Sequence, residues 1–99
     1  MNPDDDSRHI PRIEIECPMT YHDVDSNDIR NGVARNVSNN GILFTTMEKL
    51  AEGAVMEVHV RPPENEAPPL NAIIQIVRVN EDEQVAGQFR IAGMIKAIK

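Results

Sequence analysis

Apolar and polar residues alternate along several short segments of the chain, and this period of two is typical of half-buried β-strands. The alternation is clearest in residues 54–60, where every even-numbered residue is apolar, and residues 71–79 are rich in β-branched side chains. The six predicted strands are residues 13–21 (with Pro18 at a bulge or an edge position), 32–37, 42–46, 54–60, 71–79 and 85–91.

Segments rich in Asp, Asn, Gly and Pro separate these strands, and such residues favour turns and loops. Residues 38–41 are expected to form a tight turn, and residues 61–69 a loop, because proline cannot donate to a sheet ladder. Only residues 94–99 are expected to form a helix, which would be short. Short strands at regular spacing favour an antiparallel barrel or a sandwich.

Length and charge limit the number of domains and the classes of partner that this chain can have. A chain of 99 residues allows one domain, expected over residues 8–99 after a flexible acidic N-terminus of residues 1–7. A net charge of -6 disfavours binding to a nucleic-acid polymer. No apolar run approaches the ~20 residues that span a bilayer, and no signal peptide is recognisable. We therefore expect a cytoplasmic protein without membrane insertion.

Arg8 and Arg12 form an R-x-x-x-R motif immediately before the first predicted strand. Pro11 lies between them, argues against a helix and favours an extended chain. In an extended chain, residues i and i+4 lie on one side, roughly 13 Å apart. Two guanidinium groups at that spacing can hold a ligand larger than one phosphate, because each suits phosphate oxygens or the O6/N7 edge of guanine.

Asn36, Ser38 and Gly41 form an N-x-S-x-x-G motif between the second and third predicted strands. Asn36 and Ser38 are two residues apart, so their side chains share a side while Val37 faces the core. Their oxygens can accept hydrogen bonds from the ring N–H and amino groups of a purine, and Gly41 permits a close backbone approach or a left-handed turn. Taken alone, the first motif is more typical of solvated surface arginines and the second of an ordinary hairpin turn. Their order around one predicted strand is what favours a ligand site.

Other reactive residues form no recognisable site. His9, His22 and His59 are dispersed and show no metal-ligand spacing, so we expect no metal site. Cys17 is the only cysteine, which excludes a disulfide framework. No catalytic constellation is present, so an enzyme is not expected.

The R-x-x-x-R motif, a strand and then [D/N]-x-S-x-x-G together resemble the PilZ domain family, the bacterial receptor module for cyclic di-GMP. The resemblance extends through most of the chain, with weaker landmarks at residues 50–53, 76–78 and 87–89. It implies a six-stranded antiparallel β-barrel with a short C-terminal helix, no enzymatic activity and no cofactor.

In that family, arginines of the N-terminal loop hold the phosphates and guanine of cyclic di-GMP, and the second motif holds a guanine against the barrel. By position, the resemblance implies ligand-binding roles for Arg8, Arg12, Asn36, Ser38 and Gly41, with His9 and Arg78 as further neighbours. Asn36 stands where Asp is common, which removes a charge but keeps an acceptor. Ser7 stands where many members have another arginine, which leaves one or two ligands per chain open.

Two functions remain from these observations. The first is a cyclic di-GMP receptor that orders its N-terminal arginine arm over the barrel and signals to an unidentified effector protein, in motility or biofilm regulation. The second is a PilZ-type protein-interaction domain that binds no nucleotide. The retained arginine pair favours the first function, while the effector, the oligomeric state and the affinity stay open.

Overall fold

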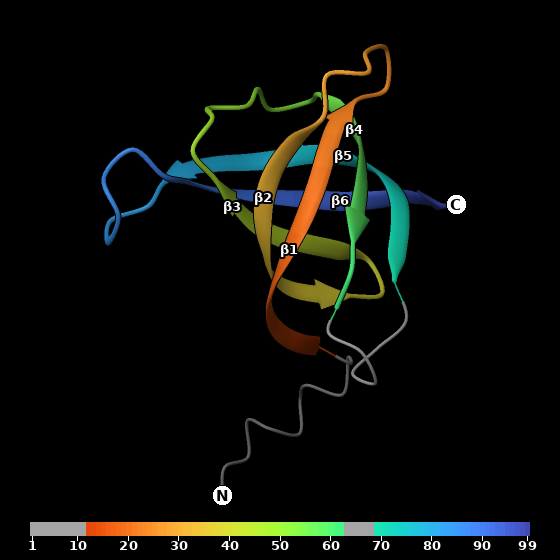
Figure 1. Ribbon diagram of the computed structural model, residues 1–99, viewed down its shortest axis with the longest axis horizontal. Helices are drawn as coiled ribbons and strands as arrows, with labels where there is room; N and C mark the ends of the chain where they lie inside the picture. The colour runs from red at the N-terminus through yellow and green to blue at the C-terminus, as the bar shows by residue number, and fades with distance from the viewer. Residues whose placement is uncertain (1–11, 63–68) are drawn as a thin grey trace, which may run out of the picture.

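The computed structural model describes residues 12–62 and 69–99, with side chains from residue 16 onward. Its six strands form a closed antiparallel barrel in the order β1-β2-β3-β6-β5-β4 (Figure 1). The strands are β1 (Arg12–Asp23), β2 (Arg30–Ser38), β3 (Gly41–Thr46), β4 (Val55–Val60), β5 (Leu70–Glu81) and β6 (Phe89–Ile98). The expected six-stranded antiparallel barrel is confirmed.

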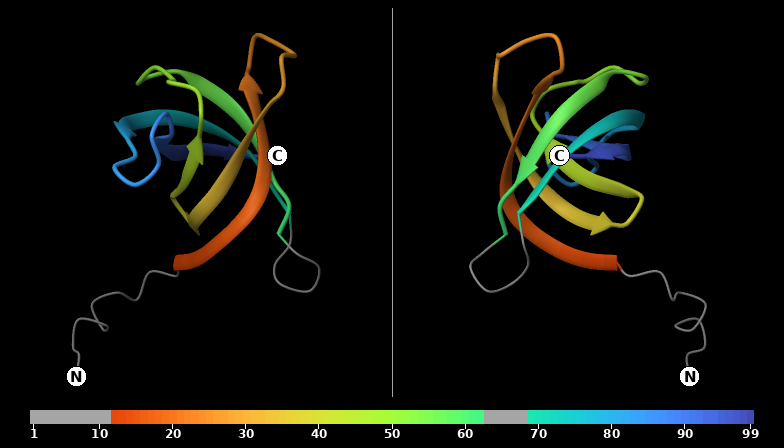
Figure 2. Two further views of the ribbon diagram at one scale, coloured as in Figure 1. Left: turned by 60° about the vertical axis from the view of Figure 1, so that its left-hand side comes forward. Right: turned by 90° about the vertical axis from the view of Figure 1, so that its right-hand side faces the viewer.

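Consecutive strands form hairpins around most of the barrel, and two non-consecutive pairings close it. β3 pairs with β6, and β1 pairs with β4 from Met19↔Val60 to Asp23↔Met56. The β1–β4 pairing closes the barrel from Met19 onward, whereas residues 12–18 of β1 pair with β2 alone. Figure 2 shows the strands curving around the barrel, while the β5–β6 loop projects from it.

The core contains the inward-facing half of each alternating strand. Its largest fully buried side chains include Tyr21, Phe44, Val58, Ile74, Ile76 and Ile91. The rings of Tyr21 and Phe44 pack in a tilted arrangement with their centroids 5.4 Å apart, within the range that aromatic pairs prefer. Cys17 is also buried, as expected of a small core residue, and burial raises the pKa of its thiol.

Register shifts interrupt the β1–β2 and β2–β3 ladders once each and the β5–β6 ladder twice. The β1–β2 register shifts between Glu14 and Cys17, immediately before Pro18, where the sequence predicts a bulge or an edge position. β1 pairs with β4 only from Met19 onward, so the missing N–H of Pro18 removes no hydrogen bond from the β1–β4 ladder. A second shift, between Ala34 and Asn36, makes Arg35 the extra residue of β2.

The C-terminal segment differs from the expectation. Residues 94–99 do not form the predicted helix; β6 continues to Ile98, which lies opposite Ala72. The predicted start of the last strand at Val85 is also wrong, because Val85 lies in the β5–β6 loop. A six-residue helix is only marginally stable by itself, whereas the twelve residues of β5 offer this segment a ladder partner.

None of the described residues, 12–62 and 69–99, forms a helix, so these residues contain no helix able to cross a membrane.

Candidate functional site

A cleft of about 1240 Å³ lies on the outer face of the barrel, over β2, β3, β5 and β6. A row of paired residues crosses its floor: Asn36 on β2 is opposite Leu43 on β3, and Leu43 is opposite Ala92 on β6. Ala92 in turn is opposite Arg78 on β5. With neighbouring strands ~4.8 Å apart, the row measures roughly 14 Å along the curved sheet. The floor is therefore apolar at its centre and polar at both ends.

Arg35 holds one side of this cleft. Its Nη1 lies 2.9 Å from Oε2 of Glu16, and its Nε donates to Oγ1 of Thr45 over 3.3 Å. Glu16 is 73% exposed, so this ion pair is largely solvated and contributes only about 0.2–1 kcal/mol. A ligand anion can therefore replace Glu16 at the guanidinium at small cost.

Arg78 and Arg90 bring two further guanidinium groups to the cleft. Both are exposed, and neither makes an ion pair with a side chain that the structure describes. Arg90 lies in the row next to the floor, between Thr45 on β3 and Asn80 on β5. The cleft thus offers cationic groups that can turn toward a ligand without breaking an existing ion pair.

The two sequence motifs meet in the register of β1 and β2. Arg12 begins β1 opposite Ser38, and Glu14 is opposite Asn36. The R-x-x-x-R motif therefore leads directly onto the strand that borders the N-x-S-x-x-G motif. Arg8 and His9 lie outside the described residues, so the structure places neither.

Ser38 uses its hydroxyl within the β2–β3 turn. Its Oγ accepts from the backbone N–H groups of Asn40 and Gly41, at 3.3 and 3.2 Å. These two bonds occupy the acceptor positions of the hydroxyl, whose proton has only a long contact of 3.5 Å to the carbonyl of Gly41. Toward a ligand, Ser38 is therefore better suited to donate than to accept, contrary to the role expected from its spacing.

Gly41 has a packing role of its own. A Cβ at this position would lie 2.7 Å from the carbonyl oxygen of Gly93 on β6, a distance that real Cβ atoms do not show. Of the two reasons that the sequence offers for this glycine, close backbone approach is the one observed, because the positive-φ glycines are Gly53 and Gly87. Neither Ser38 nor Gly41 lines the cleft itself.

The β5–β6 loop gives the cleft an acidic rim of Glu81, Asp82 and Glu83. The Asp82 carboxylate accepts from the backbone N–H of Gln84 and from Nε2 of Gln88, each at 2.8 Å. These hydrogen bonds lower the pKa of Asp82. The carboxylates disfavour phosphate at this end of the cleft and can accept from the N–H groups of a base.

Sequence reasoning missed Arg90 as part of the site. The alternation of Phe89, Arg90 and Ile91 is the signal that places Arg90 on the outer face of a strand. The histidines are dispersed along the sequence, but the ring centroids of His22 and His59 lie 6.0 Å apart on the far side of the barrel. No local spacing reveals that contact, because it depends on the β1–β4 pairing.

Comparisons with known proteins agree with the barrel. The fold is similar to that of Bacillus subtilis Inhibitor of motility (MotI/DgrA), with a TM-score of 0.74, 16% identity and 93% of this chain covered. It is also similar to MrkH of K. pneumonia in a complex with c-di-GMP, with a TM-score of 0.65, 14% identity and 91% covered. The chain spans 44% of each of those two proteins.

No curated protein sequence matches the chain significantly. The PilZ domain, in contrast, matches residues 6–94, which include both motifs and five of the six strands completely. The chain therefore belongs to the PilZ domain family.

Proposed function

We propose that this chain is a receptor for cyclic di-GMP that acts in the cytoplasm as a binding or adaptor module rather than as an enzyme. Membership of the PilZ family supports the proposal, as does the likeness to MrkH, whose structure holds this ligand. The observation that carries it is the row Asn36–Leu43–Ala92–Arg78, which provides an apolar floor between two polar ends.

Each part of the ligand has a chemically suitable counterpart. Arg12 and Arg8 hold phosphate oxygens as the N-terminal arm closes over the outer face of β2. A guanine ring lies on Leu43 and Ala92, with the planar guanidinium of Arg78 available to stack on it. Asn36 accepts from the base, while Ser38 donates. The net charge of -6 is no obstacle, because a dianion responds to the local cluster of arginines.

Signalling follows from the arm. When cyclic di-GMP orders residues 8–12 against β2, the ligand and the arm create a surface that the free protein lacks. An effector protein that recognises this surface would distinguish the bound state from the free state. Motility or biofilm formation is the process that we expect such an effector to control.

Calorimetric titration of the chain with cyclic di-GMP tests the proposal. The wild type is expected to bind, and Arg12→Ala is expected to lose about 1–3 kcal/mol, or ~5- to 150-fold in affinity, through one lost bidentate contact. Arg61→Ala is the matched control, because Arg61 is an exposed arginine after β4 that does not line the cleft.

Two results would reject it. If the wild type shows no binding at tens of micromolar ligand, the chain is better explained as a protein-interaction domain without a nucleotide. If Arg12→Ala binds as tightly as Arg61→Ala, the arginine arm does not hold the ligand.

A further inference from the structure

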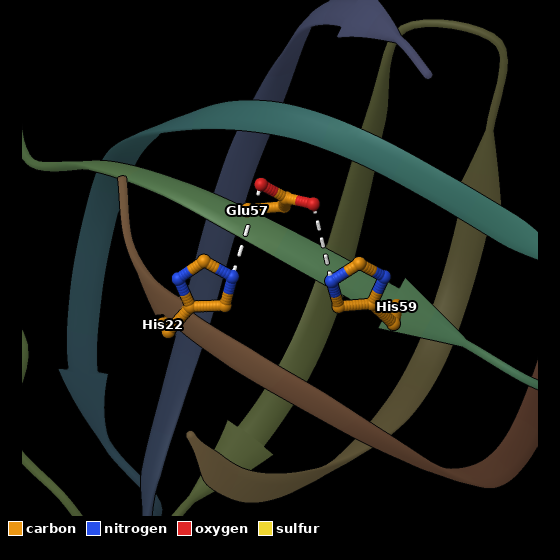
Figure 3. A group of neighbouring side chains, drawn as sticks. All are labelled: His22, Glu57 and His59. Carbon is orange, nitrogen blue, oxygen red and sulfur yellow. Dashed lines mark ion pairs between the residues drawn. The ribbon is translucent and has the colours of Figure 1, made fainter. Parts of the chain in front are cut away.

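His22, Glu57 and His59 lie together on the outer face of the barrel, where β1 pairs with β4 (Figure 3). His22 is directly opposite Glu57 in the register, and His59 follows Glu57 by two residues, so the three side chains share one face. This cluster is on the side of the barrel away from β3. None of its members lines the cleft.

The distances within the cluster are compatible with a shared metal ion, because the three ligand atoms lie within 4.8 Å of one another. Nε2 of His22 lies 3.7 Å from Oε1 of Glu57, and Nε2 of His59 lies 3.3 Å from Oε2. Ligand atoms at ~2.0–2.1 Å around a tetrahedral zinc ion are ~3.4 Å from one another. The three ligand atoms must therefore approach one another by at most ~1.4 Å to share one ion, which is within the reach of side-chain rotation.

The second ring nitrogen of each histidine is already oriented for this role. Nδ1 of His22 lies 2.8 Å from the backbone carbonyls of both Asp23 and Ser26, which can only accept, so Nδ1 carries a proton. Nδ1 of His59 lies 2.8 Å from Oδ1 of Asn71 and donates to it. In a neutral ring, the lone pair is then on Nε2, the atom that faces Glu57.

The lone pairs of two neutral imidazoles that face a carboxylate are attracted to it only if a metal ion or a proton lies between them. A histidine that binds a metal with one ring nitrogen usually donates the N–H of its other ring nitrogen to a carbonyl or carboxylate oxygen. His22 and His59 both have this arrangement, with Nδ1 as the donor and Nε2 facing Glu57. The side chains of His22, Glu57 and His59 are 15%, 18% and 29% exposed, so the cluster is partly buried but accessible. Lys99, whose Nζ lies 3.4 Å from Glu57 and which is half-exposed, is the competing cation and can turn away.

We propose that His22, Glu57 and His59 bind one divalent transition-metal ion, with at least one coordination position left for water or another ligand. Two imidazoles and one carboxylate suit zinc and its neighbours, whereas magnesium and calcium prefer oxygen ligands alone. The ion would link β1 to β4 at the pairing that closes the barrel. This site is independent of the cleft and of the nucleotide proposed for it.

Titration of the full, tag-free chain with Zn²⁺ in competition with a chromophoric chelator tests the site. One Zn²⁺ per chain is expected to bind, and Mg²⁺ is expected not to compete. Glu57→Gln is expected to weaken zinc binding at least ~10-fold, and Asn71→Leu, which removes the acceptor of His59, by ~10- to 100-fold. Glu52→Gln is the matched control, because it removes the same charge from an exposed turn.

The imidazole resonances in NMR spectra separate this site from an ion-pair cluster of protonated histidines. Zinc is expected to shift the signals of His22 and His59 and to leave those of His9 unchanged. His59→Gln provides a second variant should Glu57→Gln not give the wild-type backbone spectrum. Absence of zinc binding, equal shifts of all three histidines, or undiminished binding in folded Glu57→Gln or His59→Gln would overturn the proposal.

Discussion

The buried Tyr21 belongs to a partly buried polar network, and its effect on stability can be measured as a function of pH. The side chain is fully buried, and its hydroxyl donates to Oε1 of Glu48 over 2.9 Å and lies 2.8 Å from Oγ1 of Thr46. Arg30 pairs with the same Glu48 at 2.7 Å. Burial, reinforced by the hydrogen bond to Glu48 and its charge, raises the pKa of Tyr21 to about 12, although Thr46 and Arg30 act in the opposite direction.

The raised pKa of Tyr21 makes the free energy of unfolding depend on pH. Below pH ~10, tyrosine is protonated in both the folded and the unfolded chain, so this group adds no pH dependence. Between pH ~10 and ~12, the unfolded chain releases its proton while the folded chain keeps it, which lowers the free energy of unfolding. A shift of about two pKa units corresponds to about 3 kcal/mol lost across that window.

Tyr21 is the only tyrosine and the chain has no tryptophan, so the near-ultraviolet absorbance of tyrosinate reports on this residue alone. Urea unfolding at steps from pH 9 to pH 12 is expected to show about 3 kcal/mol more loss for the wild type than for Tyr21→Phe. The lysines titrate in both proteins, so their effect on the free energy of unfolding cancels when the wild type is compared with Tyr21→Phe. Tyrosinate forming near pH 10 in the folded protein, or equal losses in the two proteins, would refute the reasoning.

Three further predictions concern the cleft and the turn beside it. Glu16→Gln releases Arg35 from an exposed ion pair, so cyclic di-GMP is expected to bind ~1.4- to 5-fold more tightly by calorimetry; weaker binding would contradict this account. Ala92→Phe fills the cleft floor and is expected to abolish that binding while the circular dichroism spectrum stays that of the wild type. Gly41→Ala forces a Cβ against a backbone oxygen of β6 and is expected to lower the free energy of unfolding by about 1–3 kcal/mol in urea, whereas Asn39→Ala in the same turn is expected to change it little.

Most of the fold could be predicted because one face of each strand is buried. In β4, the buried Met56, Val58 and Val60 alternate with exposed or half-buried residues, and the prediction for residues 54–60 differs from the observed strand by one residue. The alternation of apolar and polar residues disappears where neither face of a strand is buried. Residues 96–98 of β6 are exposed on both faces, so their sequence shows no period of two, and only the ladder with β5 makes this segment a strand.

The candidate site likewise has a part that local sequence predicts and a part that depends on strand pairing. A local motif at a strand end and a tight turn singles out Asn36 and Ser38, of which only Asn36 lines the cleft. The row that joins Asn36 to Arg78 starts within the local β2–β3 hairpin, but it also depends on the β3–β6 and β5–β6 registers, which no spacing along the chain encodes. The contact between His22 and His59 likewise exists only because the first and fourth strands close the barrel.

Hydrogen–deuterium exchange with and without cyclic di-GMP tests the central claim most directly, because it reports on the arm and the cleft in one measurement. The account predicts slower exchange in residues 8–12, in residues 35–38 of β2 and around Ala92 of β6, while the amides around Glu57 on the opposite side keep their rates. Unchanged exchange in residues 8–12 at saturating ligand, or slowing spread evenly over all six strands, would contradict it.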